Sequence, residues 1–159
     1  MLRFLTTYRR LPPHERSVVR AALWQLPRAA IALRLKTWVP NSPVAFFATG
    51  GWDSLPTSAR RSNLPLVAQS ASPARIGLLV AAVARHCFPR SRCLTRSLAL
   101  ARILKGYGFA AELRLGVRKS ADFEAHAWVE VDGIALLDSA GELANYVALA
   151  ASTTSVKSS

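Results

Sequence analysis

The succession of one helix and three short strands between residues 93 and 139 constrains the fold most strongly. The segment CLTRSLALARILKG carries apolar residues at helical spacing and ends at a glycine. Strand patterns then follow at residues 110–117, 123–131 and 134–138. Asp132 and Gly133, between the last two strands, are typical of a tight turn. The sequence therefore predicts an α+β fold, with this helix packed on a small antiparallel sheet.

Three residues with catalytic potential occupy these elements. Cys93 opens the helix, His126 lies in the second strand and Asp138 ends the third. The free N–H groups of a helix N-terminus favour a thiolate, and the backbone N–H of Cys93 could also bind an oxyanion. A nucleophilic thiol needs an imidazole base that a carboxylate orients, so the three residues together favour a thiol hydrolase. Taken alone, each of these three residues could have a purely structural role. Cys87, which has no such partners, is interpreted as a small buried hydrophobe.

Two geometric expectations follow for this unit. The helical wheel places Cys93 near the middle of one apolar face and puts Thr95 and Ala99 on the opposite, polar side. A two-residue turn at Asp132-Gly133 would direct Asp138 away from His126. We therefore predict a three-residue loop or an equivalent bulge, with the Asp138 carboxylate hydrogen-bonded to His126.

The remainder of the chain divides into further regions. Residues 1–38 are expected to form an N-terminal helical region, in which Pro27 kinks or divides a helix over 12–38. Residues 39–73 are rich in Pro, Ser, Ala and Asn and predict an irregular connector. The catalytic core is expected over 74–150, from a helix at 74–88 to a short helix within GELANYVALA, and 151–159 are expected to be a disordered tail.

Composition narrows the functional classes. The 159 residues suit one domain, and the formal net charge of +12 indicates an anionic partner. The basic residues are scattered without an aromatic stripe, so specific nucleic-acid binding is not expected, and neither is a membrane location. Two cysteines without a signal peptide indicate a reducing, cytoplasmic compartment. The spacing of the cysteines and three histidines predicts no zinc site, and no cofactor is expected.

The catalytic segment also resembles a known family. The stretch CLTRSLALARILKGYGFAAELRLGVRKSADFEAHAWVEVDG is similar to the body of the lasso peptide leader peptidases, which are transglutaminase-like thiol proteases with a papain-like core. The resemblance is close over residues 74–139 and weak over 39–73, and residues 9–38 are similar to the leading helices of these proteins. Thr95, after Cys93-Leu94, departs from the commoner proline of the family.

The resemblance implies a function and partners. It implies a cysteine protease that removes the leader from a ribosomally made lasso precursor peptide, with Cys93 as nucleophile, His126 as base and Asp138 as the residue that orients the imidazole. Trp128 is a weaker candidate for the substrate cleft. A separate PqqD-like leader-recognition protein and an asparagine synthetase-like cyclase are the implied partners, because the chain is too short to include the recognition domain. An acyl transferase with the same triad and a non-catalytic scaffold remain the alternatives.

Overall fold

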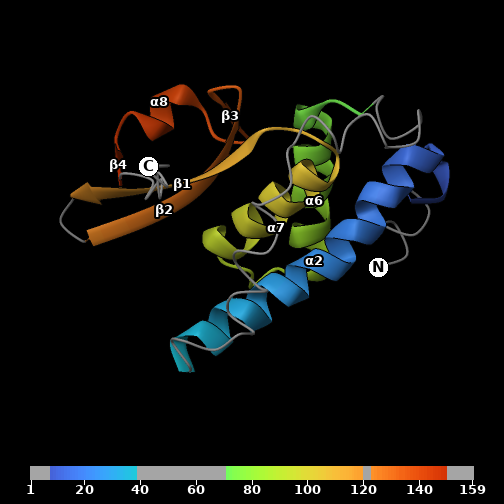
Figure 1. Ribbon diagram of the computed structural model, residues 1–159, viewed down its shortest axis with the longest axis horizontal. Helices are drawn as coiled ribbons and strands as arrows, with labels where there is room; N and C mark the ends of the chain where they lie inside the picture. Colours follow the sequence, from blue (N-terminus) through green and yellow to red (C-terminus); the bar gives the residue numbers. More distant parts are fainter. Residues whose placement is uncertain (1–7, 39–70, 120–122, 150–159) are drawn as a thin grey trace, which may run out of the picture.

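The computed structural model describes residues 8–38, 71–119 and 123–149. Figure 1 shows the long helices on one side of the molecule and a small sheet, with the short helix α8 beside it, on the other. The helices are α2 (Pro13–Trp38), α6 (Pro73–Cys87), α7 (Cys93–Gly106) and the short α8 (Ala140–Leu143). The strands are β1 (Ala111–Lys119), β2 (Phe123–Val131), β3 (Ile134–Leu136) and β4 (Val147–Ala148). The predicted connector over most of 39–73 and the predicted tail at 151–159 lie outside the described residues.

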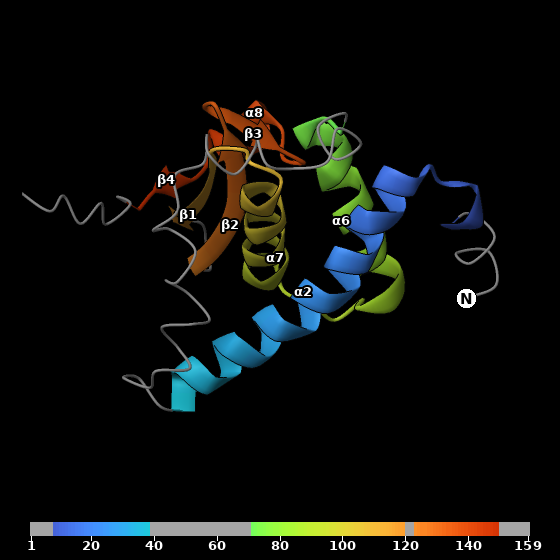
Figure 2. The same cartoon turned by 45° about the vertical axis from the view of Figure 1, so that its right-hand side comes forward.

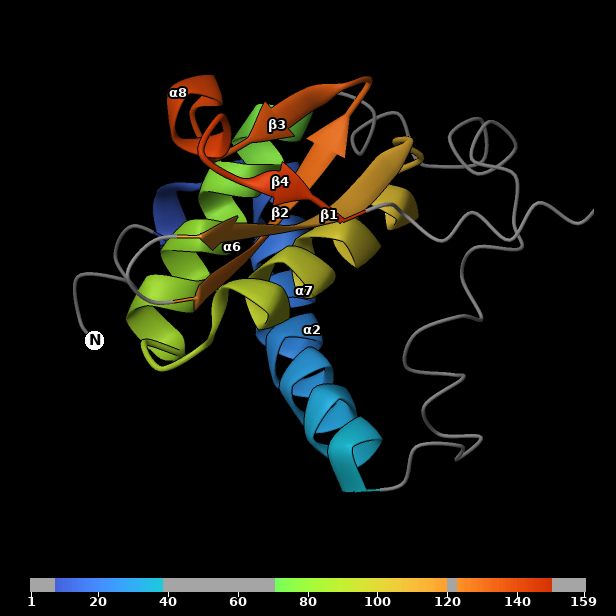
Figure 3. The ribbon, with the colours of Figure 1, turned by 90° about the vertical axis from the view of Figure 1, so that its left-hand side faces the viewer.

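The sheet is antiparallel and has the strand order β3-β2-β1-β4. Figure 3 shows the strands in front of the helices, so one face of the sheet is covered. Helix α7 contacts β1 and β2 on one side and α2 and α6 on the other (Figure 2). The predicted α+β arrangement, with the cysteine-bearing helix packed on a small antiparallel sheet, is confirmed.

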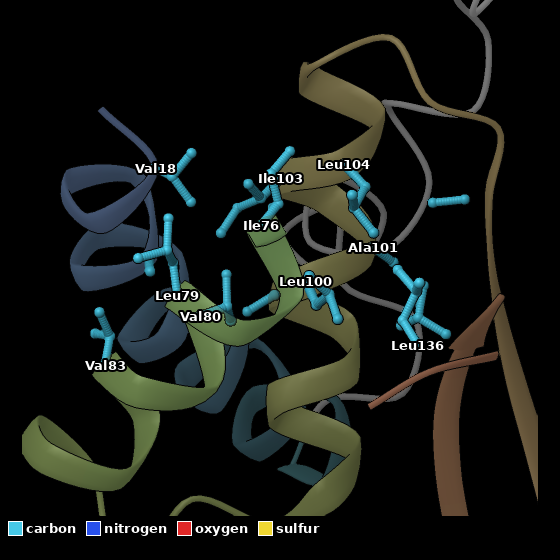
Figure 4. Packing of buried hydrophobic residues seen from close by; sticks show 14 of the residues in the cluster. Val18, Ile76, Leu79, Val80, Val83, Leu100, Ala101, Ile103, Leu104 and Leu136 are labelled. Carbon is cyan, nitrogen blue, oxygen red and sulfur yellow. The ribbon is translucent and has the colours of Figure 1, made fainter. Parts of the chain in front are cut away.

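The central place of α7 corrects the predicted single apolar face. Thr95 and Ala99, expected on the polar side, are buried together with the apolar residues of the helix. Because α7 is covered from two directions, small residues on its second side pack against neighbouring elements instead of facing water. Figure 4 shows the resulting core, in which side chains of α2, α6, α7 and β3 meet. Labelled examples are Val18, Ile76, Leu100 and Leu136.

Helix α2 runs without interruption through Pro27, so of the predicted kink or division at that residue the division is absent. A proline inside a helix removes one backbone hydrogen bond. Here the flanking residues Leu26 and Ala29 are fully buried in the core, and this packing holds both halves of the helix in place. Glu15 and Arg75 join α2 to α6 through two hydrogen bonds of 2.8 and 2.9 Å. The hydrogen bonds from Arg75 lower the pKa of Glu15.

The C-terminal part of the described chain differs from the prediction of a single short helix. Helix α8 ends at Leu143, and β4 follows and pairs with β1 at Gly116 and Val117. Two residues are too few to carry a strand pattern, so β4 exists because the edge of β1 offers hydrogen-bonding partners. Among the described residues, no helix is both long and apolar enough to cross a bilayer.

Candidate active site

Cys93 is the first residue of α7, as the sequence predicts. The N-cap residue of this helix, Arg92, has extended backbone angles and makes no capping hydrogen bond through its side chain. In contrast, Ser72 caps α6, and Ser139 and Glu142 form a capping box on α8. The N-terminus of α7 thus has no side-chain cap. Its first-turn N–H groups can stabilise a thiolate or an oxyanion at Cys93.

The hairpin between β2 and β3 has a two-residue loop, so the predicted three-residue loop is wrong. Val131 pairs with Ile134, and Asp132 and Gly133 form the turn with φ of 53° and 77°. Positive φ at both central residues is the signature of a type I′ turn, whose twist matches that of the flanking strands. With this register alone, Asp138 would point away from His126.

A backbone bend at Leu137 restores the contact. Strand β3 ends at Leu136, and Leu137 has a φ of 73°, which is rare for a leucine. Its side chain packs over Gly77 of α6, which helps to hold the bend. Asp138 then reaches His126, with Nε2 and Oδ1 2.9 Å apart. The predicted hydrogen bond is therefore present, but the bend lies after the strand and not in the hairpin loop.

One pocket brings the three predicted residues together. It has a volume of about 230 Å³, and Cys93, His126 and Asp138 all contribute to its wall. Strand β3 pairs only with residues 129–131 of β2, so His126 lies on a stretch of β2 that β3 does not cover. Because Nε2 faces an acidic acceptor, Nδ1 remains as the basic nitrogen of the neutral imidazole. The arrangement can deprotonate a thiol and stabilise the imidazolium that results.

Ser97 connects the helix that carries Cys93 to the strand that carries His126. It lies one turn after Cys93, and its buried hydroxyl donates a 2.7 Å hydrogen bond to the carbonyl of Ala127. Residues four apart on a helix lie on the same side, so Ser97 and Cys93 both line the pocket. The bond fixes the relative position of the thiol and the imidazole.

We expect Ser97→Ala to destabilise the fold by about 1–3 kcal/mol, because it leaves the buried carbonyl of Ala127 without its partner. Urea unfolding followed by circular dichroism measures the change. Ser91→Ala is the matched control, since the hydroxyl of Ser91 makes only an exposed hydrogen bond with Arg96. An equal stability loss in the two variants would contradict the positioning role of Ser97.

Aromatic residues surround the imidazole. The rings of His126 and Trp128 stack with centroids 6.1 Å apart, and the Trp128 indole N–H donates to Glu130 at 2.8 Å. Trp128 is only 4% exposed and does not line the pocket described above. It therefore supports His126 in this structure, whereas the sequence suggests a place in the cleft. Gly116 allows this packing, because a Cβ there would lie 2.8 Å from the Trp128 ring.

Tyr146 is a site residue that the sequence does not predict. Its ring lies 5.4 Å from the His126 ring, and its hydroxyl donates to Glu124 at 2.9 Å. The pKa of Tyr146 is raised, mainly by this hydrogen bond and then by desolvation of the hydroxyl. Tyr146 directly precedes β4, and the pairing of β4 with β1 brings it to the site. The sequence carries no signal for this pairing.

The model of the transglutaminase-like superfamily matches residues 38–151, which is more than half of the chain. The chain belongs to the transglutaminase-like superfamily. No curated protein and no solved structure matches it significantly.

Membership of this superfamily agrees with the α+β fold and with a cysteine-centred site. The superfamily includes cysteine proteases and acyltransferases, both of which form a thioester on a cysteine. The match includes the whole connector region 39–73, most of which lies outside the described residues, and it leaves out all of α2 except Trp38. Within the residues that the structure describes, no group of three or more His, Cys, Asp or Glu side chains has an arrangement that could hold a metal ion.

Proposed function

We propose that this protein is a cysteine peptidase that removes the leader from a ribosomally made lasso precursor peptide. One observation carries the proposal: His126, held by Asp138 at 2.9 Å, shares a pocket with the thiol at the uncapped N-terminus of α7. The resemblance of residues 74–139 to the lasso leader peptidases supports the choice of substrate. A cytoplasmic site of action is part of the proposal, because the precursor is made on ribosomes.

The proposed chemistry assigns one role to each of the three residues. His126 Nδ1 takes the proton of Cys93, and the thiolate attacks the carbonyl carbon of the scissile peptide bond. The N–H of Cys93 donates to the resulting oxyanion. The imidazolium then gives its proton to the leaving amine, and a thioester forms. Water, deprotonated by the same imidazole, hydrolyses the thioester and frees the thiol.

An acyl transferase would share every step up to the thioester and then pass the acyl group to an amine. Mass spectrometry of the products distinguishes the two outcomes, since hydrolysis leaves a free carboxylate at the end of the leader. A non-catalytic scaffold would give neither product. The intact arrangement of Cys93, His126 and Asp138 supports an enzyme, because a scaffold has no need of all three.

We also propose that a separate PqqD-like protein presents the leader and that an asparagine synthetase-like cyclase uses the product. We expect the recognition protein to increase leader cleavage by about tenfold or more at subsaturating precursor, since prior binding raises the effective concentration of the scissile bond. The measurement is the initial cleavage rate of the cognate precursor with and without that protein. Equal rates would show that this chain binds the leader by itself, and absence of cleavage in both would contradict the proposed function.

A further inference from the structure

A second pocket lies beside the active-site pocket on the surface of α6. It has a volume of about 450 Å³ and shares Ala81 and Arg96 with the pocket that contains Cys93. Its other lining residues are Leu78, Ala82, Arg85 and Pro89. The two pockets therefore lie side by side, and we call the second one the α6 groove.

The lining of the α6 groove follows from helical spacing. Leu78, Ala81, Ala82 and Arg85 recur at intervals of three and four residues, so they form one stripe along α6. Leu78 is 56% exposed although it is a large apolar residue. The two small alanines leave room beside it. The groove thus offers an apolar floor that an extended peptide segment can cover.

Two arginines give the groove a positive charge. Arg85 and Arg96 are both exposed, and neither pairs with a carboxylate of the described residues. Arg96 donates through Nε to Ser91 at 3.0 Å, which orients the guanidinium and leaves its terminal nitrogens available. Among the described residues that line the two pockets, Asp138 is the only acidic one, and His126 already engages it.

We infer that the α6 groove binds a segment of the peptide substrate that carries an Asp or Glu side chain a few residues from the scissile bond. A guanidinium recognises a carboxylate through paired, charge-assisted hydrogen bonds. Both arginines line the α6 groove, and Arg96 also lines the pocket of Cys93. The α6 groove adjoins the pocket of Cys93 and is positively charged, and these two features identify the occupant as an acidic segment of the substrate itself. This inference rests on the proposed peptidase function and adds to it a residue preference.

The test uses a defined pool of short synthetic peptides of mixed sequence, with cleaved bonds identified by mass spectrometry. The wild-type protein is compared with Arg85→Glu, Arg96→Glu and the control Arg20→Glu. Arg20 is exposed on α2 and lies outside both pockets, so its reversal changes the net charge equally. Each cleaved acidic peptide is then remade with Gln or Asn in place of the acidic residue.

We expect acidic residues to be enriched near the cleaved bonds, and replacement by the amide to lower kcat/KM by about tenfold. The Arg85→Glu and Arg96→Glu proteins should lose this preference, and Arg20→Glu should keep it. Equal cleavage of acidic and amide peptides by the wild type would overturn the inference while leaving the peptidase function intact. An equal effect of all three reversals would also overturn it, because the net charge would then be the cause.

A binding measurement separates the inference from the proposed function. Cys93→Ala protein is immobilised, and the peptides that it retains from the same pool are identified. The measurement is repeated with Arg85→Glu or Arg20→Glu added to the Cys93→Ala protein. Acidic peptides that are lost with Arg85→Glu and kept with Arg20→Glu support the inferred groove, even if the wild type cleaves no peptide. Retention without an acidic preference overturns it.

Discussion

Limiting iodoacetamide near neutral pH should alkylate Cys93 well before Cys87, and Cys93→Ala should abolish leader cleavage. Cys93 lines the active-site pocket at a helix N-terminus, and His126 in the same pocket can accept its proton. Cys87 packs against the hydrophobic core at the end of α6. Loss of the nucleophile removes the covalent route, so the rate should fall by about 10⁴-fold or more.

Peptide mapping by mass spectrometry locates the adduct, and the cleavage assay with the cognate precursor gives the rate. Cys87→Ala is the matched control and should retain activity, because it removes a thiol of similar exposure that faces the core. Circular dichroism establishes that both variants fold. Preferential labelling of Cys87, or cleavage by the Cys93→Ala protein, would remove Cys93 from the nucleophile role.

The helix and the strands that carry the site were accessible from sequence because each has a strong local signal. Helix α7 has apolar residues at helical spacing and ends at glycines, and β2 has the observed bounds Phe123–Val131 that the pattern predicts. The requirement that a carboxylate orient the base also predicts the hydrogen bond between Asp138 and His126. These features depend on neighbouring residues or on the chemistry of the site.

The features that sequence missed depend on tertiary contacts. An Asp-Gly pair suits both two- and three-residue loops, so the composition of the turn could not decide the register. A leucine gives no sign of a left-handed conformation, and the bend at Leu137 is supported by its packing on Gly77. The contact between Tyr146 and His126 likewise depends on β4, and a strand of two residues is too short to be predicted from a sequence pattern.

Asp138→Asn should keep the fold and lower the cleavage rate by roughly 10²–10⁴-fold. The side-chain amide of asparagine can donate to Nε2, which leaves the proton on Nδ1, where the base must be free to accept one from the thiol. Asparagine also carries no charge to stabilise the imidazolium. The fold should persist, because the bend at Leu137 and the capping box of Ser139 and Glu142 hold the backbone on either side.

Asp132→Asn is the matched control for this prediction. It makes the same chemical change in the turn of the β2–β3 hairpin, six residues before Asp138, at a position whose φ of 53° asparagine tolerates well. The control should therefore retain nearly full activity and stability, as measured by single-turnover cleavage and urea unfolding. If Asp138→Asn cleaved as fast as the wild type, the 2.9 Å contact with His126 would be structural only. The imidazole would then be oriented by its packing against Trp128 and Tyr146, and combining Asp138→Asn with Tyr146→Ala would reveal the loss that the single substitution did not.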